Sequence, residues 1–126
     1  MKTSRIALWI VVVSLLTVVP VLADGGNDDR VIVVTHLDII PTPTFMTDAV
    51  PLIEKFVLDS RKDPGVISFT MITWDPTTNH FQLIERFRNM RAFDAHVSAK
   101  YTVDFRHELQ PFIGAPYDER LYTSNP

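Results

Sequence analysis

The sequence predicts an α+β domain with one antiparallel β-sheet and helices on one face of that sheet. Two observations support this fold class. Strand-like segments rich in β-branched residues are separated by segments with helical spacing, and their order is strand, helix, strand, strand, helix, strand. Right-handed crossovers in this order give the ferredoxin-like βαββαβ arrangement, which we expect over residues 31–123.

The first half of the domain is predicted as strand, helix, strand. Residues 31–40 are almost continuously apolar and end at a proline, which indicates a strand. Residues 44–63 place apolar side chains at helical spacing and run into a Lys-Asp-Pro-Gly stop signal. Pro51 requires that this helix either begins just before it or is kinked there. Residues 65–74 alternate in polarity and therefore predict a second strand.

The second half is predicted as strand, helix, strand. After an Asp-Pro-Thr-Thr-Asn turn, residues 80–87 form the returning strand of a hairpin. Asn89 is placed to cap a helix that runs to about Ser98. A second short helix is expected over about 102–110, and a last strand around 120–123.

The amino terminus predicts export. Residues 1–23 contain two basic residues, an apolar stretch from Ile6 to Val19, and small residues before a cleavage site after Ala23, the layout of a secretory signal peptide. An uncleaved membrane anchor is the alternative, but the apolar run is shorter than the about 20 residues that span a bilayer. Residues 24–30 predict a flexible leader. We expect a periplasmic or secreted protein that leaves the membrane after cleavage.

Charge and cysteine content exclude several classes of protein. Removal of residues 1–23 would change the formal net charge from −3 to −5, and no basic run or stripe remains. Nucleic acids and anionic membrane surfaces are therefore poor partners. The chain has no cysteine, which excludes disulfides and thiolate metal ligands.

Strand parity leaves one face of the predicted sheet without a helix to cover it. On the first strand, Val34, His36 and Asp38 point to the same side. We expect Glu85 and Phe87 on this open face as well. A large exposed apolar face requires a partner, so the sequence predicts a homodimer in which two sheets close on each other.

The segment LIERFRNMRAFDAHVSAKYTVDFRHEL joins the hairpin strand to the following helices. Its strand-to-helix spacing resembles that of the antibiotic biosynthesis monooxygenase family, which folds as a dimeric α+β barrel. The preceding KDPGVISFTMITW also matches the family's helix, Pro-Gly, strand pattern, and the resemblance spans about residues 31–123. The residues that carry it are Glu85, Phe87, Ala92, Phe93 and His96.

The resemblance implies an enzyme that oxidises phenolic, quinol or anthrone-like aromatics with O₂ and without a metal, flavin or other cofactor. The substrate itself then supplies the electrons. Relatives with this fold degrade haem, using an Asn, a Trp and a His in the pocket. Here His36 stands where the Asn is expected and Phe87 where the Trp is expected, so haem degradation ranks lower. A non-catalytic binding protein for a small apolar molecule is a third alternative.

His36 is the preferred catalytic base on parity grounds. An imidazole with a pKa near 6.5 can accept a phenolic proton at neutral pH. Asp38 shares its face and could orient a ring nitrogen. The alternative is that His36 is a polar side chain buried at the dimer interface.

His96 and Glu85 have a catalytic and a structural interpretation. His96 lies on the apolar face of its predicted helix, between Phe93 and Val97. It is either a base in the pocket or a core histidine bonded to a sheet side chain such as Glu85. Glu85 lies among apolar neighbours, which disfavours its charged form unless it is hydrogen-bonded.

Aromatic side chains could line the substrate site or simply fill the core. His80 and His107 are expected near solvent. A metal site of His36, His96 and Glu85 is conceivable, but no short histidine spacing supports it, so we expect no metal and no cofactor. The aromatic candidates for substrate binding are Phe69, Trp74, Phe87 and Phe105.

Overall fold

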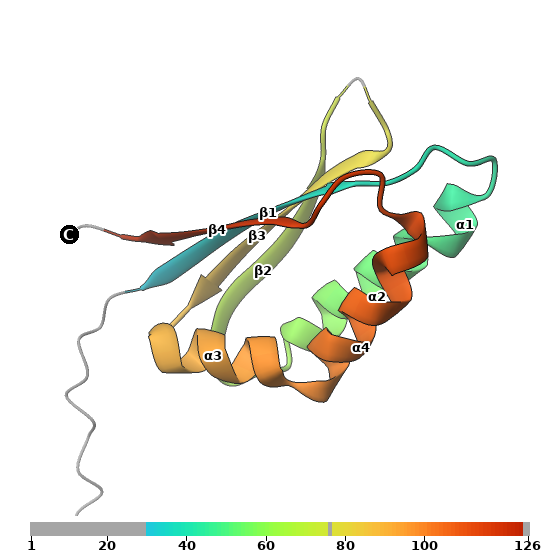
Figure 1. The fold of residues 1–126 in the computed structure, drawn as a ribbon. Coiled ribbons are helices and arrows are strands. Elements are labelled where there is room, and N and C mark those ends of the chain that lie inside the picture. The colour runs from blue at the N-terminus through green and yellow to red at the C-terminus, as the bar shows by residue number, and fades with distance from the viewer. Residues whose placement is uncertain (1–29, 76, 125–126) are drawn as a thin grey trace, which may run out of the picture.

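The computed structural model describes residues 30–75 and 77–124 (Figure 1). The predicted signal peptide (1–23) and the predicted leader, apart from Arg30, lie outside the described residues. Within the described residues, no helix is both long and apolar enough to cross a membrane.

One four-stranded sheet and its helices make up the domain, in the predicted order of elements. The strands follow each other across the sheet as β2-β3-β1-β4, and all neighbours are antiparallel, as the ferredoxin-like arrangement requires. The strands are β1 (Val31–Asp38), β2 (Val66–Thr73), β3 (His80–Phe87) and β4 (Asp118–Thr123). The helices are α1 (Phe45–Asp48), α2 (Val50–Ser60), α3 (Met90–Ser98), α4 (Lys100–Leu109) and the 3₁₀ turn η1 (Gln110–Phe112).

The helix boundaries follow from local chemistry. The predicted helix over 44–63 is divided at Ala49 into α1 and α2, and Pro51 lies in the first turn of α2, where its missing N–H removes no helical bond. The Asn89 side chain caps α3 by accepting a hydrogen bond from the Ala92 N–H at 2.9 Å. Ala99 alone separates α3 from α4 and has an extended backbone, so the chain turns sharply there.

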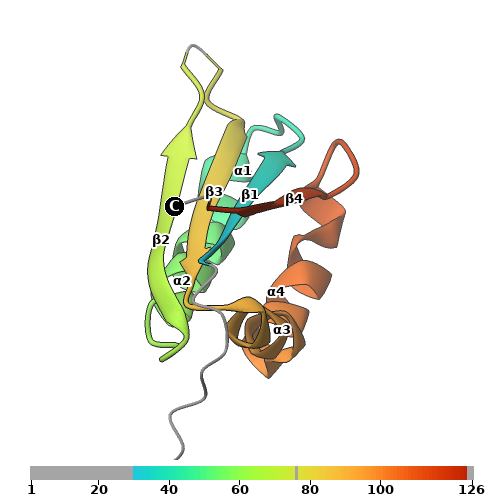
Figure 2. The same cartoon turned by 90° about the vertical axis from the view of Figure 1, so that its left-hand side faces the viewer.

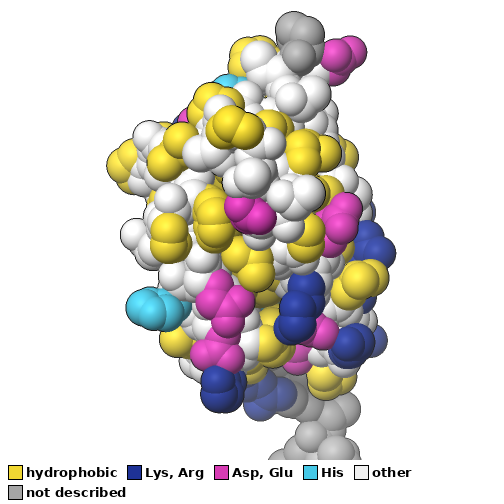
Figure 3. Space-filling model, turned by 90° about the vertical axis from the view of Figure 1, so that its right-hand side faces the viewer, with side chains coloured by type: hydrophobic (Ala, Val, Ile, Leu, Met, Phe, Trp, Pro, Cys, Tyr) yellow, Lys and Arg dark blue, Asp and Glu magenta, His cyan; other side chains and the backbone are white. Residues whose placement is uncertain are grey.

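The helices gather on one side of the sheet and leave the other side open (Figures 1 and 2). Figure 3 shows a helical side of the molecule, where apolar side chains cover much of the upper half and basic ones gather in the lower half. The core lies between the sheet and the helices. Its most deeply buried apolar side chains include Val33, Leu37, Ile53, Phe69, Leu83, Phe87 and Leu109.

Burial along β1 alternates as predicted, with Val33 and Thr35 facing the helices and Val34 and His36 on the open face. The prediction for β3 was wrong. Glu85 is paired with Val33 across the antiparallel ladder, and directly opposed residues share a face of the sheet. Glu85 and Phe87 are therefore buried on the helix side, at 2% and 0% exposure, and not on the open face.

Gly65 provides a test of the packing between the start of β2 and α3. A Cβ atom on Gly65 would lie 2.6 Å from the Ala92 Cβ, closer than side-chain carbons pack. We expect Gly65→Ala to lower the free energy of unfolding by about 1–3 kcal/mol through overpacking. Urea denaturation would measure this, and Ala92→Gly in the same chain should recover part of the loss. Strictly additive effects of the two substitutions would contradict a steric origin.

Candidate functional site

The eight side chains predicted as site residues form two groups on opposite faces of the sheet. One group lies at the open face and the other is buried between the sheet and the helices. The open-face group is His36, Asp38 and Trp74. The buried group is Phe69, Glu85, Phe87, His96 and Phe105.

The open-face group borders a shallow hollow of about 390 Å³. The Gln82 side-chain amide lies 3.3 Å from His36 Nδ1. Asp38 contacts His80 Nδ1 and not His36, so the prediction that Asp38 orients His36 was wrong. His80 is thus half-buried and paired, contrary to expectation. The hollow is lined by His36, Asp38, Trp74, His80, Phe81 and Gln82.

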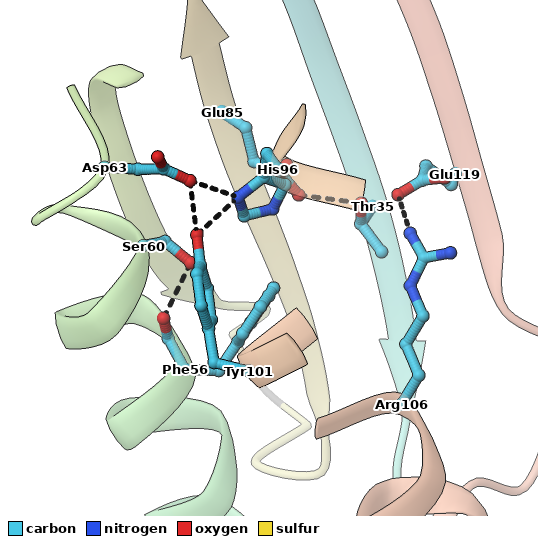
Figure 4. A network of polar contacts seen from close by, with 9 residues as sticks. All are labelled: Thr35, Phe56, Ser60, Asp63, Glu85, His96, Tyr101, Arg106 and Glu119. Carbon is cyan, nitrogen blue, oxygen red and sulfur yellow. Dashed lines mark hydrogen bonds and ion pairs between the residues drawn. The ribbon is translucent and has the colours of Figure 1, made fainter. Parts of the chain in front are cut away.

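Glu85 is a buried carboxyl group on β3. The Thr35 hydroxyl on β1 donates to its Oε1 at 3.0 Å (Figure 4). Burial raises the pKa of Glu85 to about 8, and the Thr35 hydrogen bond offsets only part of this rise. Glu85 is therefore mainly protonated at neutral pH and can donate a proton.

His96 on α3 is 2% exposed, and its nearest hydrogen-bond partner is Tyr101 rather than a sheet side chain. The Tyr101 hydroxyl donates to Asp63 Oδ2 at 2.7 Å and lies 2.9 Å from His96 Nδ1 (Figure 4). A hydroxyl has one proton, so the Tyr101 oxygen accepts from Nδ1–H. Burial lowers the pKa of His96, which keeps the imidazole neutral at neutral pH with its proton on Nδ1 and a bare Nε2.

The bare nitrogen of His96 faces the protonated carboxyl of Glu85. Nε2 lies 3.9 Å from Glu85 Oε2, which is too long for a hydrogen bond. Because Oε1 accepts from Thr35, Oε2 is the oxygen that would hold the proton. A neutral base and a neutral acid thus face each other across a short gap, and we call them the acid–base pair.

Aromatic rings enclose the acid–base pair. The ring centres of Phe87, Phe69 and Phe56 lie 5.0, 5.6 and 5.7 Å from that of the imidazole. Phe105 stacks on Phe56 at 3.9 Å. Of the four predicted aromatic residues, Phe69 and Phe87 contact the His96 ring and Phe105 lies behind Phe56. Trp74 is 59% exposed and borders the hollow on the open face. The rings keep bulk water away from both groups.

Arg106 on α4 extends the polar network toward β4. Its Nη2 lies 2.7 Å from Glu119 Oε1, and its guanidinium lies 5.2 Å from the centre of the Tyr117 ring. The Arg106 charge lowers the pKa of both Glu85 and His96. In each case this effect is smaller than that of burial, which raises the pKa of Glu85 and lowers that of His96. Its Nε is buried without a hydrogen-bond partner among the described residues.

Three residues of the site were missed by the sequence analysis: Thr35, Asp63 and Tyr101. Thr35 could have been found from the sequence, because it is a polar residue at a position where the alternation of β1 predicts burial. Asp63 was assigned to a stop signal, and Tyr101 lies in the next helix beyond Ala99. Neither has a periodicity that links it to His96, since the contact of Tyr101 depends on the turn between α3 and α4 and that of Asp63 on the loop after α2.

The two-group arrangement excludes the conceivable metal site, because His36 is on the opposite face of the sheet from His96 and Glu85. In the described part of the chain, no group of three or more His, Cys, Asp or Glu is arranged to hold a metal ion. His36 and Phe87, the residues aligned with the haem pattern, are likewise on opposite faces. His107 is exposed, as predicted.

Solved structures match the chain over most of its length. A structure named antibiotic biosynthesis monooxygenase is 18% identical, with 76% of this chain and 99% of that chain covered and a TM-score of 0.69. A Caulobacter crescentus structure provisionally given the same name is 12% identical, with 79% and 92% covered and a TM-score of 0.71. The Mycobacterium tuberculosis protein Rv0793 is 18% identical, with 77% and 96% covered and a TM-score of 0.68.

These matches define the class of fold: the chain has the fold of the antibiotic biosynthesis monooxygenases, as the sequence resemblance predicted. Among curated sequences, an uncharacterized Synechocystis protein is 27% identical over 105 residues, which cover 82% of this chain and 70% of that protein. No family model matches the chain.

Proposed function

We propose that the protein is a monooxygenase that oxidises a phenolic or quinol aromatic with O₂, without a bound cofactor, at the acid–base pair. The observation that supports this proposal best is the neutral His96 imidazole 3.9 Å from a protonated carboxyl in an aromatic enclosure. Perturbed titratable groups of this kind gather at catalytic sites. The shared fold is consistent with the proposal but does not by itself assign an activity.

The pair is closed in the structure, with each side chain 3% exposed, so substrate binding requires the enclosing aromatic rings to move apart. The first chemical step is then removal of the substrate hydroxyl proton by His96 Nε2. The resulting phenolate is electron-rich and transfers one electron to O₂, which gives a substrate radical and superoxide. These two radicals combine to form a C–O bond, and the peroxide takes back the proton held by His96. The enclosing rings exclude water from the reactive intermediates.

The second step is collapse of the peroxide to a quinone. His96 removes the C–H proton at the oxygenated carbon, the O–O bond breaks, and Glu85 protonates the departing hydroxide. Phenol and O₂ are thus converted to quinone and water, with the substrate as reductant and O₂ as oxidant. His96 then returns a proton to Glu85, which restores the pair.

The sequence favoured His36 as the base, and the geometry favours His96. His36 contacts an amide, and the carboxylate opposite it across the β1–β4 ladder, Asp118, is paired with Arg120, while Asp38 is engaged by His80. It also borders an open hollow where water has access. His96 has an acid beside it and is shielded from solvent, so it suits proton transfer to and from a reactive intermediate better.

Oxygen consumption with a panel of quinols, anthrones and simple phenols tests the proposal. We expect O₂ uptake that requires the protein, with one water and one quinone formed for each O₂. The Glu85→Gln variant, which keeps the shape but cannot donate the same proton, is the matched control and should be nearly inactive. Binding of these aromatics without any O₂ uptake would instead indicate a binding protein. A visible titration with hemin tests the haem alternative.

We also propose that the open face of the sheet is covered by a second copy of this chain. That face presents Ile72 and Tyr122, which are 43% and 48% exposed, beside the partly buried Val34 and Ile84. Asp118 and Arg120 pair on the same face, so two copies related by a two-fold axis could match charges as well as apolar area. Light scattering should give twice the monomer mass at micromolar concentration. A monomer with a cooperative thermal transition would contradict this proposal.

Export remains a proposal based on residues 1–23. Mass spectrometry of the exported protein should show Asp24 at the amino terminus, because the predicted cleavage follows Ala23. Recovery of the exported or membrane-bound protein with Met1 in place would contradict it.

A further inference from the structure

We propose that Tyr101 and Asp63 form a proton relay that connects the buried His96 imidazole to solvent. They would act as positioning residues, since neither is expected to touch the substrate. The relay would reset the protonation state of His96 between turnovers; that role rests on the proposed function, but the existence of the relay does not.

The geometry of the relay is a continuous chain of short contacts. His96 Nδ1 lies 2.9 Å from the Tyr101 hydroxyl, which lies 2.7 Å from Asp63 Oδ2. Asp63 Oδ2 also lies 3.6 Å from His96 Nδ1, so the three groups form a compact triangle (Figure 4). Each step joins groups from different elements: α3, α4 and the loop after α2.

The two ends of the chain differ in their access to solvent. The side chains of His96 and Glu85 are each 3% exposed, whereas that of Asp63 is 23% exposed. Asp63 and Tyr101 also line a surface hollow of about 430 Å³ together with Asp59, Lys62 and Pro64. The acid–base pair therefore has a polar route to the surface, although aromatic rings close its surroundings.

A proton that arrives on Nε2 can leave by this route without any free ion in the core. Nδ1–H passes its proton to the Tyr101 oxygen while the Tyr101 proton passes to Asp63, which releases it to solvent. One proton enters and one leaves, and only N–H and O–H bonds change. Burial and the Asp63 hydrogen bond raise the pKa of Tyr101, so its hydroxyl stays protonated. It passes a proton on by accepting one from His96 as it gives its own to Asp63, without becoming a phenolate. The reverse passage restores the first tautomer.

The charged and titratable groups around His96 favour proton movement from the imidazole toward Asp63. Asp63 favours the imidazolium from the relay side, and Arg106 on α4 disfavours it. Glu85 on β3 is mainly neutral at neutral pH and adds little charge. A proton on the imidazole is therefore drawn toward Asp63.

Nitrogen NMR of the His96 ring tests the relay without substrate. In the wild-type protein we expect the proton on Nδ1 and none on Nε2, and a wild-type protein with the opposite tautomer would overturn the proposal. In Asp63→Asn the acceptor oxygen remains but cannot take a proton, and in Tyr101→Phe the bridging hydroxyl is lost. Solvent exchange of Nδ1–H should slow about tenfold or more in both, because exchange then requires local opening.

Asp59→Asn is the matched control, since Asp59 lines the same hollow and binds Lys55 and Lys62, outside the relay. Its exchange rate should equal that of the wild type. Equal exchange rates in folded Asp63→Asn and Asp59→Asn would overturn the relay. Because no turnover is measured, a failed oxygen-uptake assay leaves this result standing, and a failed exchange test leaves the oxygenase proposal standing.

Discussion

Replacement of His96 by alanine should lower turnover by about 10²-fold or more, the usual contribution of a general base. The same change should lower the free energy of unfolding by roughly 1–3 kcal/mol, because Tyr101 loses its donor and Glu85 its facing base inside the core. His36→Ala should leave both quantities nearly unchanged. The imidazole of His36 is only partly buried, and among the described residues its hydrogen-bond partner is the Gln82 amide, with Asp118 opposite it on β4.

Thermal unfolding and oxygen uptake measured together on the two variants separate the histidines. Turnover is compared per folded molecule, so that the lower stability of His96→Ala does not affect the comparison. A fully folded but inactive His36→Ala, with turnover retained in His96→Ala, would move the catalytic site to the open-face hollow. That outcome would restore the role that strand parity suggested for His36.

Protein stability should fall as the pH rises from about 6.5 to about 8. Glu85 has a folded pKa of about 8 and an unfolded value of 4.5, so the folded state binds more protons between these values. Stability from Glu85 is therefore complete below the unfolded pKa and decreases by up to about 1.4 kcal/mol per pH unit toward the folded pKa. His96 opposes this trend below the ordinary imidazole pKa of 6.5, because its lowered pKa makes the unfolded state the better proton acceptor there.

Glu85→Gln isolates the contribution of the carboxyl group to this pH dependence. The amide keeps the shape and can still accept from Thr35, but it has no charge to bury. Above pH about 8 we expect the variant to be more stable than the wild type by about 2 kcal/mol or more. Denaturant titrations across the pH range would measure this difference. The same alkaline decline in both proteins would assign the effect to another group.

The order of the elements could be predicted from the sequence because it depends on local signals. Asn89 is an N-cap, the return strand over 80–87 follows a clear turn, and Pro51 is compatible only with a helix start or a kink. These signals act within a few residues, so a single sequence contains them. The start of β4 was predicted near residue 120, whereas the strand begins at Asp118, because its length depends on pairing with β1.

The composition of the site could be predicted only in part. The pairing of Glu85 with His96 depends on the register of β3 against β1, which joins residues about fifty positions apart in the sequence. Parity within β3 showed that Glu85 and Phe87 share a face, but only the ladder shows which face. The relay requires in addition the position of the loop that contains Asp63 relative to α4, and no local pattern encodes it.

The sharp turn at Ala99 links the protonation of His96 to the packing of α3 against α4, so substitutions near it affect both properties. His96 and Tyr101 lie on either side of that turn, and their hydrogen bond joins the last turn of α3 to the first turn of α4. A drift mutation at Tyr101 would thus alter the tautomer of His96 and the angle between two helices at once. Such substitutions should show strong epistasis, so divergent sequences would be expected to replace His96, Tyr101 and Asp63 together or to retain all three.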